Sequence, residues 1–465
     1  MKTRGYLYCG LTTTLNIIIY AATFGSFLWL EGRVRHGYFR NWLKRFGYRP
    51  RRFVQPTTEN ELVSLIKTST GMRTFGAAHS FNKGVVADDT LISLDRYSGM
   101  IRREPGNRIV LKGGTRVRDA SKLLLAIGLA FENLPSHDAQ SIGGIIATDV
   151  HGTGRDWGFV SDEVTSIKLI DGKGDVYELR PEDDLFKAAI GGIGAVGIIS
   201  EVTVQAVARF NVEQKVELST WSYVKENLAD LINKNVHLSL YLFPFTDRCQ
   251  INTWNPTSAK KSFLGPLREF IDISIDALGA AWIGNLIAYS GQLRKWSNGL
   301  TRIKRGTDLV MESYKAFNRT IYHLHQELEF AVSYERTVEV CERFKGLYER
   351  MYDKEKLPYT LFEVRFTPGG HDRTLIGPGR ERRSTWLDLL ADDSTGFEKY
   401  FAEAEKLMRE VDARPHPGKF NETFTKEDLL RLHQHHFVKF LDLVKQHDSE
   451  SKFANEFTRR LFGNR

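Results

Sequence analysis

Hydrophobic and polar positions along this chain follow two spacings, and the mixture predicts short strands interspersed with helices. Helical spacing begins after Thr58, which forms a predicted capping box with Glu61, and recurs over 117–127, where it ends at Gly128. Since helices and strands do not alternate strictly, the pattern indicates an α+β fold and not a doubly wound sheet. Strand-like runs in this half cover 108–112, 166–170, 175–179 and 197–207.

The pattern changes near residue 208, which predicts a second α+β unit. A chain of 465 residues is too long for one ordinary hydrophobic core, so two domains are expected. Strand-like runs in the second half cover 212–218, 236–242, 328–334 and 359–366, and helix-like runs cover 223–231, 396–408 and 425–447.

The N-terminal segment is apolar enough to meet a membrane. Residues 5–30 carry no charged side chain, and about 20 apolar residues span a bilayer. Basic residues dominate 33–52, and such a flank stays on the cytoplasmic side. We expect a single-pass N-terminal anchor over residues 1–32 with a cytoplasmic catalytic domain. A cleavable signal peptide is the alternative.

A second apolar run covers residues 271–287 but is interrupted by Asp272 and Asp276. Because aspartates recur inside it, we expect this run to pack over the functional site. An amphipathic element lying on a membrane is the alternative.

Composition excludes several classes of function. The net charge of +8 is concentrated between residues 33 and 52, so it indicates a local patch, and no nucleic-acid partner is expected. Cys9, Cys249 and Cys341 are too few for a disulfide framework or a zinc site, and they fit a reducing compartment. His433, His435 and His436 have no third ligand at a suitable spacing, so we interpret them as a solvated helix face and expect no metal site.

Two turns rich in small residues, 75–82 and 141–154, are the strongest candidates for a ligand site. Glycine lets the backbone approach a ligand closely and leaves N–H groups free to bind oxygen atoms. Together with a third glycine-rich segment at 191–197, these turns favour a cradle for the pyrophosphate of a cofactor. Two tight turns of an α+β core are the alternative.

The third segment reads literally as a GxGxxG motif, with glycines at 192, 194 and 197. A dinucleotide fingerprint must follow a strand and open a helix. Here a helix-like run, 184–189, precedes the glycines and a strand-like run, 198–204, follows them. The sequence therefore predicts no NAD site at this position.

Five motifs occur in a fixed order: Gly76-x-x-His79-Ser80, Ser141-Ile-Gly-Gly144 running into His151-Gly-Thr-Gly154, Gly192-x-Gly-x-x-Gly197, Glu363-Val-Arg365 and His416-Pro-Gly-Lys419. With these motifs, residues 50–460 resemble the flavoprotein oxidases of the vanillyl-alcohol-oxidase type, in the sugar-lactone and alditol oxidase branch. The resemblance implies a two-subdomain PCMH-type FAD-binding domain at 48–208. It also implies an α+β cap domain at 209–420 and a C-terminal segment, 421–465, that returns to the FAD domain.

The resemblance implies FAD as the cofactor, bonded covalently through His79 to the flavin 8-methyl group. A histidine that only hydrogen-bonds near the flavin is the alternative. The residues implied to bind FAD are Gly76, Ala77, Ala78, His79, Ser80, Ser141, Gly143, Gly144, Thr148, His151, Gly152, Thr153, Gly154, Gly197 and Ile198.

The resemblance also implies three catalytic residues: Glu363, Arg365 and Lys419. Arg365 and Lys419 would place positive charge near the developing alkoxide and the reduced flavin. Glu363 would share a strand face with Arg365 and bind substrate hydroxyls. The family usually has tryptophan where this chain has Pro417. This difference bears on whether Lys419 occupies the family's position.

The implied function is an FAD-dependent oxidoreductase that oxidises a CH–OH group of an aldono-1,4-lactone or alditol by hydride transfer to flavin N5. Oxygen, a quinone or a cytochrome would reoxidise the flavin. One alternative is the same chemistry on a lipid-linked sugar or a sterol-like substrate. Another is a non-catalytic, membrane-bound interaction protein that retains the fold.

Overall fold

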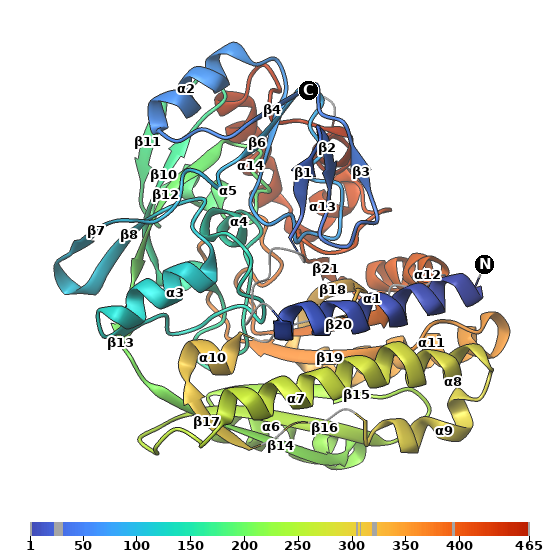
Figure 1. The fold of residues 1–465 in the computed structure, drawn as a ribbon. Helices are drawn as coiled ribbons and strands as arrows, with labels where there is room; N and C mark the ends of the chain where they lie inside the picture. The colour runs from blue at the N-terminus through green and yellow to red at the C-terminus, as the bar shows by residue number, and fades with distance from the viewer. Residues whose placement is uncertain are drawn as a thin grey trace.

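The computed structural model describes residues 2–22, 31–303, 306, 308–318, 323–392 and 396–463. Two regions of mixed helices and strands are visible in Figure 1. The upper region contains most of the first 208 residues and the C-terminal helices, and the lower region is built on one large sheet. The predicted mixture of helices and strands is confirmed.

The upper region holds two main sheets. An antiparallel five-stranded sheet has the order β11-β10-β12-β8-β7, and a parallel three-stranded sheet has the order β4-β6-β5. Their strands are β4 (Arg52–Val54), β5 (Met72–Phe75), β6 (Thr90–Ser93), β7 (Met100–Glu104), β8 (Arg108–Lys112), β10 (Val164–Ile170), β11 (Val176–Leu179) and β12 (Ile198–Gln205), and β9 (Leu129–Ala130) pairs with β13 (Val207–Ala208). The helices are α2 (Glu59–Thr68), α3 (Val117–Ala126), α4 (Ile142–Ala147) and α5 (Asp184–Ala189), with short 3-10 turns η1 (Pro105–Asn107) and η2 (Val160–Glu163).

Local signals predicted this region well. At the start of α2 the Thr58 hydroxyl accepts a hydrogen bond from Glu61 N at 3.2 Å, which is one half of the predicted capping box. The Glu61 carboxylate accepts from Thr57 N at 2.7 Å. The glycines of the GxGxxG segment lie between α5 and β12, so the predicted order of helix before and strand after is confirmed.

The lower region, which we call the cap, is built on an eight-stranded antiparallel sheet of order β17-β14-β16-β15-β19-β20-β18-β21. The sequence analysis did not predict β16, β20 or the long helix α11. The strands are β14 (Asn211–Thr220), β15 (His237–Leu242), β16 (Arg248–Thr257), β17 (Leu309–Glu312), β18 (His325–Ser333), β19 (Thr360–Thr367), β20 (Ser384–Asp392) and β21 (Arg414–Pro415). The helices are α6 (Trp221–Lys234), α7 (Gly265–Leu278), the π-helical η3 (Gly279–Gly284), α8 (Asn285–Tyr289), α9 (Leu293–Leu300), α10 (Ser313–Phe317), η4 (Tyr334–Arg336), α11 (Thr337–Glu355) and α12 (Phe397–Glu410).

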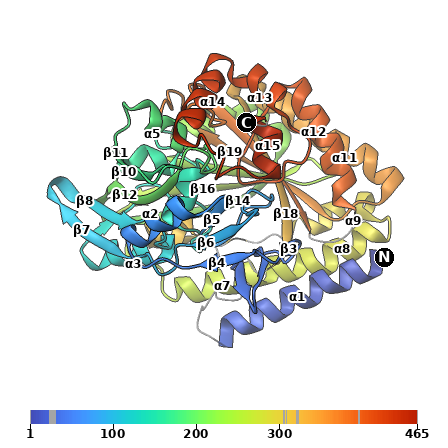
Figure 2. The same cartoon turned by 90° about the horizontal axis from the view of Figure 1, so that it is seen from above.

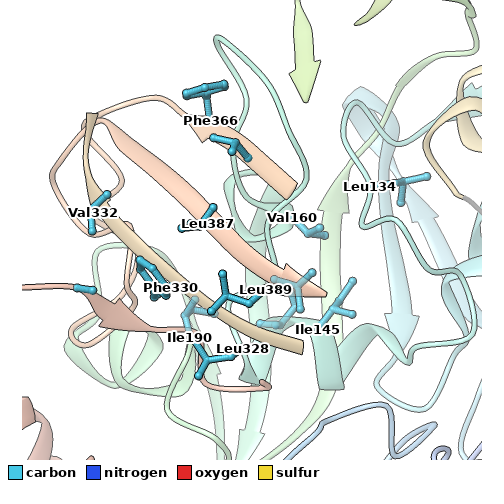
Figure 3. Packing of buried hydrophobic residues seen from close by; sticks show 14 of the residues in the cluster. Leu134, Ile145, Val160, Ile190, Leu328, Phe330, Val332, Phe366, Leu387 and Leu389 are labelled. Atoms are coloured by element: carbon cyan, nitrogen blue, oxygen red, sulfur yellow. The ribbon is translucent and has the colours of Figure 1, made fainter. Parts of the chain in front are cut away.

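One face of the cap sheet is apolar and joins the main hydrophobic core. Figure 3 shows Leu328 and Phe330 of β18 with Leu387 and Leu389 of β20, in the same cluster as Ile145 of α4. Since side chains alternate along a strand, the intervening residues of β18 and β20 face the other way, toward the functional site.

The C-terminal helices are α13 (Lys426–His433), α14 (His435–His447) and α15 (Glu456–Phe462). The segment after α14 lies beside β5, because Met72 N donates to Lys452 O at 2.7 Å and Arg73 donates to Phe453 O at 2.7 Å. The predicted continuous helix over 425–447 is broken at Gln434, whose φ is 50°. The interpretation of the histidines as one solvated helix face is therefore wrong, since His433 ends α13 and is buried.

The N-terminal helix α1 (Lys2–Ala22) lies along α7, η3 and α8, on the front of the molecule in Figure 1. Residues 23–30 of the predicted anchor lie outside the described residues. Within the described chain one helical stretch is long and apolar enough to cross a membrane, and it is Gly265–Tyr289, not α1.

The basic segment after α1 was expected to flank a membrane anchor, and no strands were predicted between residues 33 and 48. It folds into a small antiparallel sheet of β1 (Arg33–Arg35), β2 (Tyr38–Arg40) and β3 (Gly47–Tyr48). This sheet is attached to the turn that carries His79. Gly32 N donates to Ala77 O at 2.8 Å, and Trp42 N donates to Ala78 O at 3.3 Å.

His371, in the loop between β19 and β20, joins the cap to the upper region. Its ring nitrogens lie 3.2 Å from Asp149 Oδ2 and 2.9 Å from Asp162 Oδ1. Burial alone would lower the pKa of His371, but the two carboxylates raise it to about 9. A group with a raised pKa in the folded state stabilises the fold below its unfolded pKa and loses that effect as the pH rises.

We expect the free energy of unfolding to fall as the pH rises from 6.5 through 9, with His371 accounting for up to about 3 kcal/mol of the decrease. Urea unfolding of the wild type and of His371→Gln at pH 6 and above pH 9 measures this contribution. The difference in stability between the two proteins should be large at the lower pH and small at the higher. An equal difference at both would contradict the assignment.

Candidate active site

Three cavities adjoin one another between the upper region and the cap. The glycine cavity is lined by the small-residue turns, the histidine cavity by His79, His137, His151 and His416, and the cap cavity by the polar face of the cap sheet. The first two share His79, Ser80, Gln140 and Thr148. The last two share Ser136, His325, Glu327, Arg365 and Lys419. The three cavities therefore form one series, with Arg365 and Lys419 at its second junction.

The glycine cavity brings the two predicted turns into contact. A Cβ added at Gly76 would lie 1.9 Å from Ser141 Oγ, so only glycine allows this approach. Ser141 also caps α4, since its hydroxyl accepts from Gly144 N at 3.3 Å. The predicted cofactor residues that line this cavity are Gly76, Ala77, Ala78, His79, Ser80, Ser141, Gly143, Gly144, Thr148, Gly197 and Ile198.

The remaining predicted cofactor residues lie elsewhere. His151 lines the histidine cavity, and Gly152 and Thr153 line the cap cavity. Gly154 lines none of the three. A Cβ at Gly154 would lie 2.2 Å from Trp157 O, so chain packing explains this glycine.

His79 lies where the glycine and histidine cavities meet. Its ring stacks on Trp42 with centroids 4.9 Å apart, and its edge meets His137 at 4.2 Å. Nε2 of His79 is buried and has no hydrogen-bond partner among the described residues. Burial and the neighbouring His137 hold the pKa of His79 well below its usual value, so the imidazole is neutral and keeps a free lone pair.

Side chains from both regions meet at the far wall of the histidine cavity. His151 Nε2 lies 3.0 Å from Glu329 Oε1, and His416 is close enough that the three could together hold a metal ion. However, the Glu329 carboxylate also accepts a hydrogen bond from the Arg365 guanidinium. Because a fixed cation already neutralises this carboxylate, we interpret the group as a hydrogen-bonded cluster.

Arg365 and Lys419 each pair with a different carboxylate of β18. Arg365 binds Glu329, and Lys419 binds Glu327. Asp388 of β20 lies between the two cations, with Oδ2 3.8 Å from Arg365 Nη2 and 3.5 Å from Lys419 Nζ. The predicted catalytic residues Glu363, Arg365 and Lys419 all line the cap cavity.

Three carboxylates stand in a row across the sheet, because Asp388 is the register partner of Glu329 on one side and of Glu363 on the other. The sequence analysis missed Glu327, Glu329 and Asp388. A single aspartate inside the apolar run of β20 was the available signal. Carboxylates this close together repel one another unless cations lie between them or one of them is protonated.

The pKa shifts follow this arrangement. Burial and Glu329 raise the pKa of Asp388 well above its usual value, which favours the protonated form of this carboxyl group. Burial opposes the ionisation of Glu329, but Arg365 and His151 keep its pKa low. Burial lowers the pKa of Arg365, yet Glu329 and Glu363 more than reverse this, so the guanidinium stays charged. Burial lowers the pKa of Lys419 to about 7.

We expect Glu329→Gln and Asp388→Asn to affect stability very differently. Removing the Glu329 charge leaves Arg365 buried without its partner and should cost about 3–5 kcal/mol. Asp388→Asn replaces a neutral acid with an amide of the same shape and should cost about 1 kcal/mol or less. Urea unfolding at pH 7 compares the two. Equal losses would show that Asp388 is ionised.

Pro417 does not displace Lys419. The turn over 416–419 is held by the loop after His79, since the Asn82 amide donates to Pro417 O at 2.7 Å and to Lys419 O at 2.9 Å. Phe81 N also donates to Gly418 O at 2.8 Å. Backbone contacts therefore fix this turn whatever side chain stands at position 417.

Comparison with known proteins agrees with this geometry. Residues 202–461 match the family described as D-arabinono-1,4-lactone oxidase, and residues 50–180 match an FAD binding domain. The chain is 26% identical over 436 residues to L-gulono-1,4-lactone dehydrogenase of Mycobacterium tuberculosis, covering 91% of this chain and 98% of the relative. It is 24% identical over 447 residues to L-gulonolactone oxidase of Mus musculus, covering 92% and 99%.

Among solved structures, cholesterol oxidase from B. sterolicum is similar with a TM-score of 0.77 and 16% identity. The alignment covers 93% of this chain and 97% of that one. At this identity the likeness concerns the fold alone and says nothing of the substrate.

Proposed function

We propose that this chain, which belongs to the D-arabinono-1,4-lactone oxidase family, oxidises a CH–OH group of an aldono-1,4-lactone or a related alditol. The chain is an FAD-dependent oxidoreductase. The observation that carries the substrate proposal is the series of cavities. One end has the small-residue lining that a dinucleotide needs, and the other end presents carboxylate and amide groups among apolar side chains. Arg365 and Lys419 lie between the middle and outer cavities.

The residues present fit FAD. The Gly76–Ser141 contact brings two turns of small residues together, and backbone N–H groups in such turns can bind a pyrophosphate. The buried, unpartnered Nε2 of His79 offers a bonding position at the junction with the histidine cavity. We therefore place the pyrophosphate in the glycine cavity and the flavin ring in the histidine cavity.

When bound, FAD accepts the hydride from the substrate carbon, and the substrate hydroxyl must also lose a proton. Arg365 cannot supply or accept that proton, because carboxylates hold its guanidinium charged. Its role is to stabilise the developing alkoxide. Lys419, with a pKa of about 7, can hold a proton or release it at neutral pH.

The cap cavity is suited to a substrate with several hydroxyl groups. Glu363 shares its strand face with Arg365 and borders the cavity, where a carboxylate accepts hydrogen bonds from hydroxyls. Gln250 and Asn252 of β16 line the same space with amides. A sterol-like substrate would leave these carboxylate and amide groups without hydrogen-bond partners, although apolar residues such as Leu361 and Leu390 share the same lining.

We also propose that FAD is bonded covalently through His79, and that oxygen, a quinone or a cytochrome reoxidises it. The neutral imidazole at the junction of two cavities supports the covalent bond. Association with a membrane belongs to the same proposal, and the apolar stretch Gly265–Tyr289 supports it.

Anaerobic mixing of the purified holoenzyme with a panel of substrates tests the function. We expect L-gulono-1,4-lactone, D-arabinono-1,4-lactone or an alditol to bleach the flavin absorbance. Cholesterol in detergent serves as the comparison and should leave it unchanged. Bleaching by cholesterol alone, or by no member of the panel, would contradict the proposal.

A further inference from the structure

Helix α1 turns polar residues toward the protein and aliphatic residues away from it. Its polar residues Thr13 and Asn16 are buried against the protein, whereas Leu11 and Ile18 are 61% and 58% exposed. A helix on the surface of a soluble domain normally turns its apolar stripe inward. The aliphatic side of α1 therefore faces away from the protein that supports it.

Helix α7 shows the same inversion. Asp272 and Asp276 line the cap cavity, while Ile271 and Ile275 are 46% and 37% exposed on the outer side. Because its aspartates form part of that lining, α7 cannot leave the protein to span a bilayer without opening the cavity. The apolar stretch Gly265–Tyr289 can meet a membrane only along its side.

The two helices form a single layer. A Cβ at Gly10 would lie 2.5 Å from the Trp282 ring, so glycine permits close packing, and Trp282 Nε1 donates to Thr14 at 3.1 Å. Tyr20, at the other end of α1, stacks on Phe270 at 5.6 Å, which makes the helices antiparallel. Figure 2 shows them side by side at the lower edge. We call the outer surface of α1 and of the stretch from α7 to α8 the apolar face. It is represented by Leu7, Leu11, Ile18, Leu267, Ile271 and Leu286.

The exposed charges on the segment that carries α7, η3, α8 and α9 are basic, although Lys261 pairs with Glu312 at 2.6 Å and Arg294 pairs with Asp353 at 2.9 Å. Residues 5–22 of α1 contain no charged side chain. From 258 to 303 every exposed ionisable side chain is basic, and the three acids of this stretch are half-buried. The exposed basic residues are Lys260, Lys261, Arg268, Arg294, Lys295 and Arg302.

The β1–β3 sheet lies on the same side of the molecule as α1 and α7 (Figures 1 and 2). A basic hollow lies at this sheet. Arg33, Arg40 and Arg49 line it, together with Arg35 and Lys44. Its one described carboxylate, Glu31, is already paired with Arg116 at 3.1 Å and Arg118 at 2.7 Å. Burial and the surrounding arginines lower the pKa of Lys44. The hollow therefore has the charge that an anionic group would neutralise.

We propose that the apolar face and the basic hollow dock together on an anionic phospholipid bilayer, with α1 and α7 in the plane of the membrane. The outer leucines and isoleucines enter the boundary between headgroups and acyl chains, and the hollow binds lipid phosphates. This arrangement gives a geometry and a lipid class to the membrane association proposed above, on which it rests, and it replaces a spanning anchor with a peripheral contact.

Flotation of the full-length holoenzyme with lipid vesicles tests the proposal. We expect binding to phosphatidylcholine vesicles that contain phosphatidylglycerol to exceed binding to pure phosphatidylcholine by about tenfold or more, and to weaken in high salt. Leu11→Glu/Ile271→Glu should lower binding about tenfold or more. Arg40→Gln/Arg49→Gln should remove most of the preference for anionic lipid.

Leu430→Glu/Val438→Glu is the matched control, since these residues are similarly exposed on α13 and α14. It should bind vesicles as the wild type does. Equal binding to neutral and anionic vesicles, or full binding by Leu11→Glu/Ile271→Glu, would overturn the proposal. The proposal would also be overturned if the wild type were a dimer and Leu11→Glu/Ile271→Glu a monomer. The apolar face would then be the contact with a second copy of the chain. Flavin reduction by lactone is measured in parallel, so the membrane contact and the catalytic proposal can fail separately.

Discussion

Replacing Arg365 with methionine is expected to slow flavin reduction by substrate about 10²–10³-fold while FAD stays bound. The guanidinium is buried at the junction of the histidine and cap cavities and is held charged by Glu329 and Glu363. Methionine keeps an unbranched apolar stem but removes the guanidinium, with the charge that stabilises the alkoxide and its hydrogen bond to Glu329. Anaerobic stopped-flow reduction measures the rate, and the flavin content of the purified protein shows that FAD is retained.

The loss of Arg365 also leaves Glu329 without its partner, so a loss of stability must be separated from a loss of chemistry. The double variant Arg365→Met/Glu329→Gln removes both charges, and we expect it to recover stability but not rate. Arg382→Met is the matched control, because Arg382 is a largely buried cap arginine that lines none of the three cavities. A normal reduction rate in Arg365→Met would refute the assigned role.

Replacing His79 with alanine is expected to convert covalently bound flavin into flavin that acid releases completely. This change removes the neutral imidazole, whose buried Nε2 has no hydrogen-bond partner among the described residues. The glycine cavity keeps the Gly76–Ser141 contact, so FAD should still bind without the covalent bond. After acid precipitation, the wild-type pellet should stay yellow and the variant's flavin should appear in the supernatant.

His137→Ala is the control for this experiment, since His137 lies 4.2 Å from the His79 ring and is also buried. It should keep the flavin in the pellet. If the wild-type flavin is released entirely by acid, the covalent bond does not exist and His79 is only a neighbour of the ring.

The glycine-rich part of the site was predictable because its signals are local, whereas Glu363, Arg365 and Lys419 were named through the resemblance to a known family. Glycine at 76, 143 and 144 is needed wherever a backbone approaches a ligand, and this requirement is legible without the fold. The alternation that places Glu363 and Arg365 on one strand face is a property of two adjacent positions. The predicted domain limits at 208 and 420 are not tested by these observations and stay predictions.

The carboxylates around Arg365 were not predictable in the same way. Glu327 and Glu329 lie on β18 and Asp388 lies on β20, a strand that the sequence analysis missed. Their meeting depends on the register of β18 with β20 and of β20 with β19. Strand order and register are set by contacts between distant parts of the chain, which periodicity within one segment does not encode.

The amino-terminal end shows the same division most clearly. Its apolar composition by itself determined that α1 would seek an apolar environment, just as the glycine-rich turns indicated a cradle for a pyrophosphate. Only the tertiary structure decided that Thr13 and Asn16 face inward and that α1 lies on α7 as one half of a layer. Composition fixes how much apolar surface a segment carries, but the partner against which it packs decides which side of that surface remains exposed.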